Sequence, residues 1–426
     1  MLNFIAATTR CRTVSIPKLS GLALIIGIFS FVLSGCSGSK ATRTDAAGIS
    51  AGDRDELLAR LPETFRFAGS QYDRMLARLT NGPMFPRSYE NGRHRLVNAR
   101  DWTSGFFPGA LWYLYDYTRD PKWLHAASNY TARLSSIQNF RGHHDVGFML
   151  YCSYGNGLRL TGEASYQPVL LRGAESLASR FKPEVGLIRS WDFGGWSCPV
   201  IIDNMMNLEL LMWAARNGGD SRLREIALSH ADRTLKNHFR ADYSSFHLVD
   251  YNPANGTILG KQTVQGFADH TAWARGQAWG LYGFTMMARE TGRADYLAHA
   301  TNIANFLVNH PRMPADKIPY WDFDAPNIPN EPRDASAGAI MSSALIELSR
   351  LVGGGAGKRY FEVARQQLLS LSSPAYRADV EKDGDFILRH SVGHIPEKHE
   401  IDVPIVYADY YFLEALLRYR DRVTAR

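Results

Sequence analysis

Apolar residues recur at spacings of three and four along nearly the whole chain after Asp53. This spacing gathers apolar side chains on one face of a helix. Long runs of alternating β-branched residues, which would predict a substantial sheet, are missing from the sequence. The pattern therefore predicts an all-α protein. The helical spacing covers 55–79, 104–119, 121–138, 146–161, 164–181, 203–217, 220–237, 272–291, 293–310, 334–352, 357–372 and 402–420.

The predicted helices pair through short turns rich in Gly, Pro and Asp, and longer loops join one pair to the next. Short turns on one face and long loops on the other are typical of a closed ring of helical hairpins. Twelve segments then predict six hairpins, an (α/α)6 barrel. An open helical solenoid is the alternative, although its loops would normally be more uniform. The short turns lie at 118–121, 161–163, 217–220, 291–293 and 353–357, and the long loops at 182–202, 238–271, 311–333 and 373–401.

The N-terminus has the features of an export signal. Arg10, Arg12 and Lys18 precede the apolar run Leu19–Leu33, which is shorter than the ~20 residues of a stable membrane span. The run ends in Leu33-Ser34-Gly35-Cys36, which is similar to a bacterial lipoprotein cleavage box whose cysteine receives the lipid. An ordinary signal peptide or an uncleaved anchor is the alternative. The sequence thus predicts an exported bacterial lipoprotein, periplasmic or anchored in the outer membrane through Cys36.

This interpretation divides the chain into a signal peptide (1–35), a flexible polar tether (36–52) and a single barrel domain (53–426). It also changes the charge balance. The whole chain carries +6, but three of its basic residues belong to the signal, which leaves +3 on the rest. The part of the chain after the signal peptide, called the body below, is therefore nearly neutral. This argues against nucleic acid as a partner, because phosphate binding needs a clustered cationic face.

The long loops carry most of the unusual polar and aromatic residues. Asp145 and Asp203 stand just before predicted helices, where either one alone could be an ordinary N-cap. Trp and Tyr stand beside carboxylates, Asn and Gln, the composition of a carbohydrate site in which rings stack on sugar faces. A closed ring of helical hairpins would bring these loops together on one face, which favours a carbohydrate site over isolated N-caps. The clusters lie at 101–107, at 143–148, at 191–198 with 202–204, at 265–267 with 273–279, and at 319–324 with 333–334.

Other site types find little support in the sequence. His143-His144 has no second half at metal-ligand spacing, so a zinc site is not predicted. The glycine run at 353–357 lacks the Lys-Ser/Thr of a phosphate-binding loop, and no Gly-x-Ser-x-Gly elbow occurs. Cys152 and Cys198 could form a disulfide in an oxidising compartment or remain buried thiols.

From Trp102 to Arg418 the chain resembles the unsaturated glucuronyl hydrolases of glycoside hydrolase family 88. The resemblance implies an (α/α)6 barrel that acts after polysaccharide lyases. Lyases leave a sugar with a C4=C5 double bond at the non-reducing end, and the family removes that unsaturated uronate by hydrating the double bond. The motifs that carry the resemblance are His144-Asp145-Val146-Gly147-Phe148, Ile202-Asp203-Asn204-Met205-Met206-Asn207, Gln265-Gly266 and Trp273-Ala274-Arg275-Gly276-Gln277-Ala278-Trp279, with Pro319–Asp324 and Ala408–Tyr411 in support.

The resemblance also implies roles for individual residues. Asp203 matches the catalytic acid/base and Asp145 its partner carboxylate. An unsaturated uronate oligosaccharide is the implied substrate, and the implied reaction requires no metal and no organic cofactor. The positions that match substrate contacts are Trp102, His144, His247, Gln265, Trp273, Arg275 and Trp279.

Three other functions are consistent with parts of the sequence. An unsaturated rhamnogalacturonyl hydrolase shares barrel and chemistry but takes pectin fragments. A non-catalytic glycan-binding lipoprotein would be expected to lose one of the two aspartates, and both are present. A barrel polysaccharide lyase would need a Tyr/His or Arg proton-transfer set.

The nearly neutral body also implies that an anionic substrate is held by a few individual side chains at the site, with Arg275 the first candidate.

Overall fold

The computed structural model describes residues 55–79 and 82–425. The predicted signal peptide, the lipidation site Cys36 and the tether therefore lie outside the described residues. Cys152 and Cys198 lie inside them, and both are buried free thiols.

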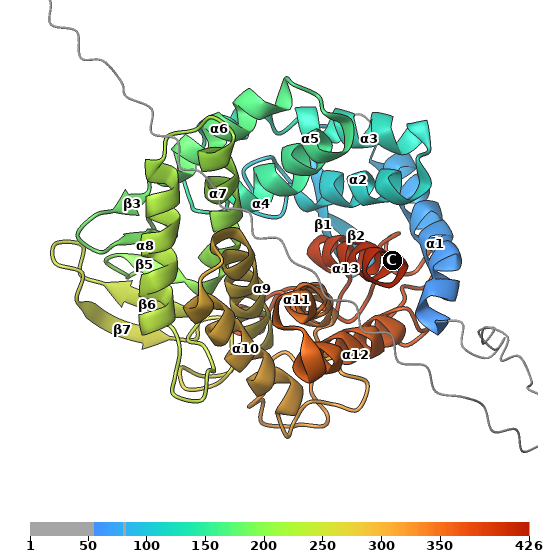
Figure 1. Cartoon of the computed structure of the whole chain (residues 1–426). Coiled ribbons are helices and arrows are strands. Elements are labelled where there is room, and N and C mark those ends of the chain that lie inside the picture. Colours follow the sequence, from blue (N-terminus) through green and yellow to red (C-terminus); the bar gives the residue numbers. More distant parts are fainter. Residues whose placement is uncertain (1–54, 80–81, 426) are drawn as a thin grey trace, which may run out of the picture. The chain divides into compact units, whose positions relative to one another are not determined.

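The helices form two concentric rings, as Figure 1 shows along the axis of the barrel. Each inner helix packs against the next, and the last returns to the first. The inner ring consists of α2 (Phe106–Thr118), α4 (Val146–Leu150) with α5 (Asn156–Thr161), α7 (Leu208–Arg216), α9 (Ala274–Thr291), α11 (Ala335–Val352) and α13 (Val406–Thr424). The outer ring consists of α1 (Glu56–Arg78), α3 (Pro121–Ala132), α6 (Tyr166–Ala178), α8 (Arg222–Asn237), α10 (Ala294–Asn309) and α12 (Gly354–Leu371).

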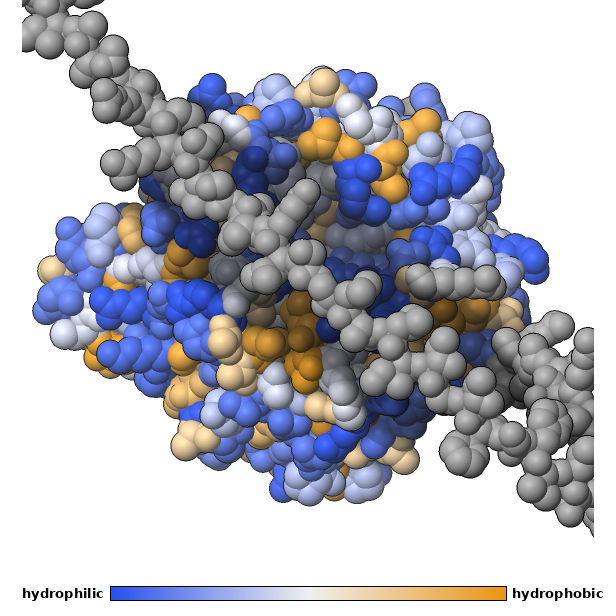
Figure 2. All heavy atoms as spheres, viewed as in Figure 1, coloured by the Kyte–Doolittle hydropathy of each residue, from blue (hydrophilic) through white to orange (hydrophobic). Residues whose placement is uncertain are grey.

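The inner helices make the core, since most of their residues are buried and most of the buried ones are apolar or small. By length and composition α11 could cross a membrane, but most of it is buried inside the barrel. The outer helices are buried on one face only, and the described surface on the side seen in Figure 2 is mostly hydrophilic with scattered hydrophobic groups. The fold is the predicted (α/α)6 barrel.

Short turns close five of the hairpins at the predicted places. The α9–α10 turn uses Gly292 at φ 68° and the α11–α12 turn uses Gly353 at φ 64°, both in the left-handed region that glycine tolerates. The sixth pair joins the two ends of the described chain. There the Tyr72 hydroxyl of α1 donates to the Asp409 carboxylate of α13 at 3.2 Å.

The long loops contain short strands that the sequence pattern did not predict. Two to six residues are too few to show alternation, so the helical periodicity of the chain hid them. The largest sheet of the described chain has only three strands, in agreement with the expectation that no substantial sheet forms. The strands are β1 (Phe85–Glu90) with β2 (Arg93–Val97), β3 (Phe181–Lys182) with β4 (Leu187–Ile188), and β5 (Pro199–Ile201), β6 (Leu248–Tyr251) and β7 (Ile258–Gln262).

The three-stranded sheet positions one of the predicted aspartates. β5 pairs with β6 in antiparallel register, with Ile201 opposite Leu248. The next backbone N–H, of Ile202, donates to the His247 carbonyl at 2.9 Å. The chain then turns into a 3-10 helix, Ile202–Asn207, which leads into α7. Asp203 and His247 are thereby held side by side, although 44 positions separate them in the sequence.

Candidate active site

The predicted site residues meet where the inner helices begin. Asp145 precedes α4, Asp203 lies in the 3-10 turn before α7, Arg275 is in the first turn of α9, and Asp334 precedes α11. The N-terminal ends of helices carry unpaired N–H groups and a partial positive charge. A ring of such ends at one mouth of the barrel favours a bound anion.

Asp145 is not an ordinary cap. It occupies the N-cap position of α4, but its carboxylate accepts no capping hydrogen bond from the described backbone. Asp334 shows what a cap looks like in this barrel, since its carboxylate accepts from the backbone N–H of Ser336 at 3.0 Å. The Asp145 carboxylate is therefore free for another role.

Asp203 is a buried carboxyl, only 6% exposed. Burial raises its pKa to about 7, the positive charge of Arg275 lowers it in part, and the negative charge of Asp145 raises it again. The nearest imidazole nitrogen, Nε2 of His247, lies 3.7 Å from Oδ2, too far for a hydrogen bond. Asp203 can therefore hold a proton near neutral pH and deliver it to a bound molecule.

Asp145 has the opposite tendency. Burial alone would raise its pKa, but His144 and His143 more than offset burial, so that the pKa of Asp145 is lowered. Nδ1 of His143 lies 3.0 Å from Oδ2, and Nε2 of His144 lies 3.4 Å from Oδ1. Two neighbouring carboxyl groups whose pKa values are pushed apart are the usual arrangement of a proton donor beside an ionised partner.

Two of the neighbouring imidazoles, those of His144 and His247, are uncharged. Burial lowers the pKa of His144 to about 4 and that of His247 well below its ordinary value. Both are therefore neutral at pH values where Asp203 titrates. A neutral imidazole can donate or accept a hydrogen bond without adding a second charge.

Unpaired buried polar atoms gather at this mouth of the barrel. Buried polar atoms normally have partners, so a cluster without them marks a place where a ligand supplies the partners. Within residues 55–79 and 82–425, the atoms near the two aspartates that lack a hydrogen-bond partner include Asp203 Oδ2, both ring nitrogens of His247, Arg275 Nε and the Tyr407 hydroxyl.

Arg275 is less available than the sequence suggested. Its Nη1 lies 3.2 Å from the Asp334 carboxylate, and its Nη2 donates to the Gly393 carbonyl at 2.7 Å. Nη1 also donates to the Val392 carbonyl. Most of the guanidinium thus fastens the loop 373–401 to α9 and α11, and Nε is the N–H left for a ligand.

Gln265 also holds the loop 373–401, because its Nε2 donates to the Gly393 carbonyl at 3.3 Å.

The three predicted tryptophans differ in exposure. Trp102 is half-buried and packs against Phe148 at 5.6 Å between ring centroids, whereas Trp273 and Trp279 are buried in the wall. Trp102 therefore has ring surface to offer a sugar, while the other two shape the pocket.

Sequence reasoning missed several residues of this site. His143 contacts Asp145, yet its only signal was its place next to the motif. Tyr407 lies under the guanidinium of Arg275, 5.3 Å from ring centroid to Cζ. Phe193 is 67% exposed and stacks on Trp191 at 5.4 Å. Both rings of that pair belong to the aromatic cluster that the sequence marked without assigning a role.

A small cationic cavity of about 230 Å³ lies beside this mouth. It is close to the aspartates because the backbone of Trp191 pairs with that of His143. Asp192 neutralises part of its charge by pairing with Arg180 at 2.9 Å. Local positive charge is thus present at the rim, although the body as a whole is nearly neutral. Arg141, Ser179, Arg180, Lys182, Arg189 and Asp192 line the cavity.

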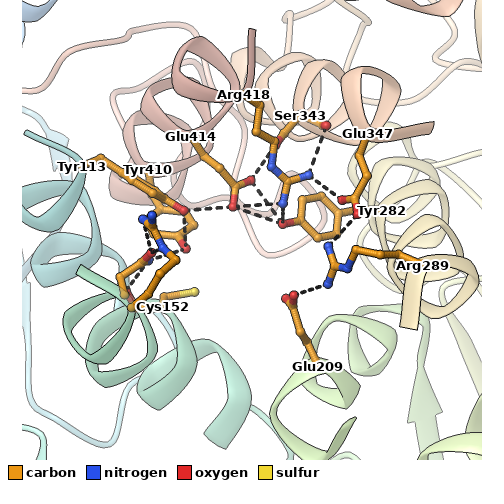
Figure 3. A network of polar contacts seen from close by, with 12 residues as sticks. Tyr113, Cys152, Glu209, Tyr282, Arg289, Ser343, Glu347, Tyr410, Glu414 and Arg418 are labelled. Atoms are coloured by element: carbon orange, nitrogen blue, oxygen red, sulfur yellow. Dashed lines mark hydrogen bonds and ion pairs between the residues drawn. The ribbon is translucent and has the colours of Figure 1, made fainter. Parts of the chain in front are cut away.

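A second cavity, of about 520 Å³, is separate from this site. It lies between the inner helices, among the residues of Figure 3. There Glu414 accepts hydrogen bonds from Tyr113 at 2.9 Å and Tyr282 at 3.1 Å, and Arg418 pairs with it at 3.4 Å. These groups satisfy one another, so we interpret the network as a structural element of the barrel.

Within the described ranges, no group of three or more His, Cys, Asp or Glu residues is arranged to hold a metal ion. Another buried carboxyl with a raised pKa, Asp409, lies away from the site. Burial raises its pKa to about 7, and its carboxylate accepts the backbone N–H groups of Ile387 at 3.0 Å and Leu388 at 2.9 Å. Asp409 thus anchors the loop 373–401, which explains its motif without a catalytic role.

A scan against models of protein families gave no match. The chain is 44% identical over 362 residues to the unsaturated glucuronyl hydrolase of Formosa agariphila, across 82% of this chain and 90% of that protein. A crystal structure of an unsaturated glucuronyl hydrolase specific for heparin has a TM-score of 0.84 and 47% identity, across 88% of this chain and 99% of that one. A Streptococcus agalactiae glucuronyl hydrolase mutant complexed with dGlcA-GalNAc6S has a TM-score of 0.73 and 27% identity, across 85% and 92%.

Proposed function

Because the chain belongs to the unsaturated glucuronyl hydrolases of glycoside hydrolase family 88, we propose that it releases unsaturated glucuronate from lyase-generated oligosaccharides. The substrate carries a 4-deoxy-hex-4-enuronate at its non-reducing end. The reaction is hydration of the C4=C5 double bond, followed by loss of the adjoining sugar. The observation that carries the proposal is the pair of carboxyl groups, Asp203 and Asp145, with pKa values shifted in opposite directions.

The first step is a proton transfer to carbon. The C4=C5 bond is an enol ether, so protonation at C4 leaves positive charge on C5 that the ring oxygen shares. Asp203 supplies this proton, and its pKa of about 7 keeps a large fraction of the carboxyl protonated near neutral pH. An ordinary exposed Asp, with a pKa of about 3.9, would be almost fully ionised there.

Water then adds to C5, and its proton passes to the ionised Asp203, which restores the starting carboxyl. The product of this step is a hemiketal at C5. The hemiketal opens by breaking the bond from C5 to the ring oxygen, which leaves a ketone at C5 and a hemiacetal at C1. The hemiacetal expels the adjoining sugar as an alcohol, so the glycosidic bond breaks without direct attack at the anomeric carbon.

Asp145 stabilises the charge that forms during this sequence. It stays ionised, since the histidines beside it lower its pKa. An ionised carboxylate in a buried site stabilises a developing cation more strongly than it would in water. The unpaired nitrogens of His247 and the exposed ring surface of Trp102 supply contacts that orient the sugar.

Unsaturated disaccharides provide the direct test. The purified protein should bleach the ultraviolet absorbance of the C4=C5 double bond and release a free reducing sugar. An increase in that absorbance would instead indicate a lyase, and unchanged absorbance with measurable binding would indicate a glycan-binding protein. Bleaching confined to pectin fragments would favour the rhamnogalacturonyl type. A panel with and without sulfate, in the same assay, defines the parent polymer.

For the N-terminal region we propose export and lipid attachment at Cys36, because Leu33-Ser34-Gly35-Cys36 follows a basic and then an apolar segment. The full-length chain should partition into the membrane fraction of its bacterial host. Cys36→Ala should abolish lipid incorporation, whereas the matched variant Cys11→Ala, outside the cleavage box, should retain it. Equal lipid incorporation in both variants would contradict the proposal.

A further inference from the structure

His143 lies between two oxygen atoms that accept hydrogen bonds. Its Nε2 is 2.9 Å from the backbone carbonyl of Arg100, and its Nδ1 is 3.0 Å from Oδ2 of Asp145. A backbone carbonyl can only accept, so Nε2 must carry a proton. When Asp145 is ionised its carboxylate also only accepts, so Nδ1 must carry a proton as well. These two contacts thus favour an imidazolium opposite an ionised Asp145.

A second contact defines the alternative state. The backbone N–H of Asp145 points to Nδ1 of His143 at 3.3 Å, which requires a lone pair on that nitrogen. Neutral His143 can accept this N–H, whereas the imidazolium cannot. The contact to the carboxylate is the shorter of the two, which favours the charged state. Nδ1 therefore changes partner with protonation while Nε2 keeps its contact with Arg100.

We propose that His143 is a positioning residue which, as an imidazolium paired with Asp145, keeps Asp145 ionised while Asp203 holds its proton. The kinetic part of this proposal rests on the proposed function. The paired charges also limit the repulsion that Asp145 exerts on a bound uronate carboxylate, because the imidazolium lies 3.0 Å from the carboxylate oxygen.

The charged groups around His143 are few. Burial acts to lower the pKa of His143, whereas Asp145, the Arg100 carbonyl and Asp101 act to raise it, and the net direction is upward. Asp101 is already paired with Arg87 at 3.0 Å, which leaves Asp145 as the main partner. The ring of Phe140 covers one side at 4.7 Å between centroids, and the backbone of Trp191 pairs with that of His143. The neighbouring His144 is neutral because burial lowers its pKa to about 4.

Two uncharged substitutions separate charge from shape. Asn places an amide near the position of Nδ1, so His143→Asn can keep a hydrogen bond to Asp145. Gln places an amide near the position of Nε2, so His143→Gln can keep the bond to the Arg100 carbonyl. His125, which is exposed on α3, gives the matched control His125→Asn. Unchanged thermal unfolding identifies the variants that remain folded.

The pH profile of kcat/KM reports the charge. Without the imidazolium, Asp145 accepts a proton at higher pH, and its unscreened charge raises the pKa of Asp203 further. Both limbs of the profile should therefore move to higher pH in both His143 variants. At about pH 5 we expect kcat/KM to fall about tenfold more than in the control, since an adjacent opposite charge lowers a carboxyl pKa by 1–3. Profiles of both His143 variants that superimpose on that of His125→Asn would overturn the proposal.

A titration that needs no turnover separates this proposal from the proposed function. Nitrogen-15 NMR of the histidine rings in the full chain should show that His143 titrates above the ordinary range. In Asp145→Asn the same resonance should titrate at lower pH, because the partner charge is gone. An unchanged titration would overturn the ion pair even in an active enzyme. A shifted titration in a protein that leaves unsaturated disaccharides intact would refute only the proposed function.

Discussion

Replacing Asp203 with Asn tests the acid/base and the burial argument together. The substitution keeps the shape of the side chain but removes the proton that the reaction transfers. General acid catalysis typically contributes 10²–10⁴-fold to rate. Since the pKa of Asp203 is raised to about 7 while that of the neighbouring Asp145 is lowered, we expect turnover to fall by at least about a thousandfold.

The same substitution should stabilise the fold. A carboxyl with a pKa of 3.8 in the unfolded chain and about 7 in the folded one binds more protons when folded, so stability is lost as pH rises between these values. From about pH 4 to about pH 7 this loss amounts to about 3 kcal/mol. Asn cannot ionise, so the variant does not undergo this loss. Between about pH 4 and about pH 7, the free energy of unfolding of Asp203→Asn should therefore rise by about 3 kcal/mol relative to that of the unsubstituted protein.

Two assays follow from these expectations. Turnover is measured from the bleaching of the double bond, and the free energy of unfolding from denaturant titrations at both pH values. Asp73→Asn serves as the matched control, since Asp73 is an exposed carboxylate that pairs with Lys122 on the surface at 2.7 Å. Wild-type turnover in Asp203→Asn would refute the assignment of the acid. A stability difference that is the same at both pH values would refute the raised pKa.

Substitutions at three further positions probe the supports of the site. Arg275→Ala removes the counter-charge of the buried Asp334 and the contact that holds the loop 373–401. We expect it to lower the free energy of unfolding, measured in denaturant, by about 3–5 kcal/mol. A decrease below about 1 kcal/mol would contradict that role. Gly147→Ala puts a Cβ 2.6 Å from the Cα of Asn207, at the end of the 3-10 turn that carries Asp203. Because this clash displaces the turn, we expect kcat to fall about 100-fold. An unchanged kcat would show that the turn adjusts. Trp102→Ala should raise KM about tenfold, because ring stacking on the sugar is lost. Trp102→Phe keeps a ring and should have a KM close to that of the unsubstituted protein. If KM is the same in Trp102→Ala as in the unsubstituted protein, Trp102 does not contact the sugar.

The helices and their pairing could be predicted from the sequence because each inner helix keeps an apolar pattern and each short turn contains Gly, Pro or Asp. The observed ends differ where local geometry intervenes. The predicted helix 121–138 stops at Ala132, and 146–161 contains a π turn at Tyr151–Gly155. The segment 203–217 begins as the 3-10 turn Ile202–Asn207. Side-chain periodicity does not distinguish these forms over one or two turns.

The motifs located both aspartates at one mouth of the barrel, but they did not reveal which donors are free. Arg275 was expected to hold an anion, whereas the structure shows most of its donors on the carbonyls of Val392 and Gly393. Those contacts join positions more than 100 residues apart and depend on the course of the loop 373–401. The role of His143 likewise depends on the backbone carbonyl of Arg100, which no sequence pattern indicates.

Turnover in deuterated, oxygen-18 water tests the hydration mechanism most directly. We expect deuterium at C4 and the heavy oxygen at C5 of the released uronate, with the departing sugar keeping its own oxygen. Both labels follow from proton delivery by Asp203 to C4 and water addition at C5. A released uronate that retains its C4=C5 double bond and carries the heavy oxygen at C1 would refute hydration, since it would show direct displacement at the anomeric carbon.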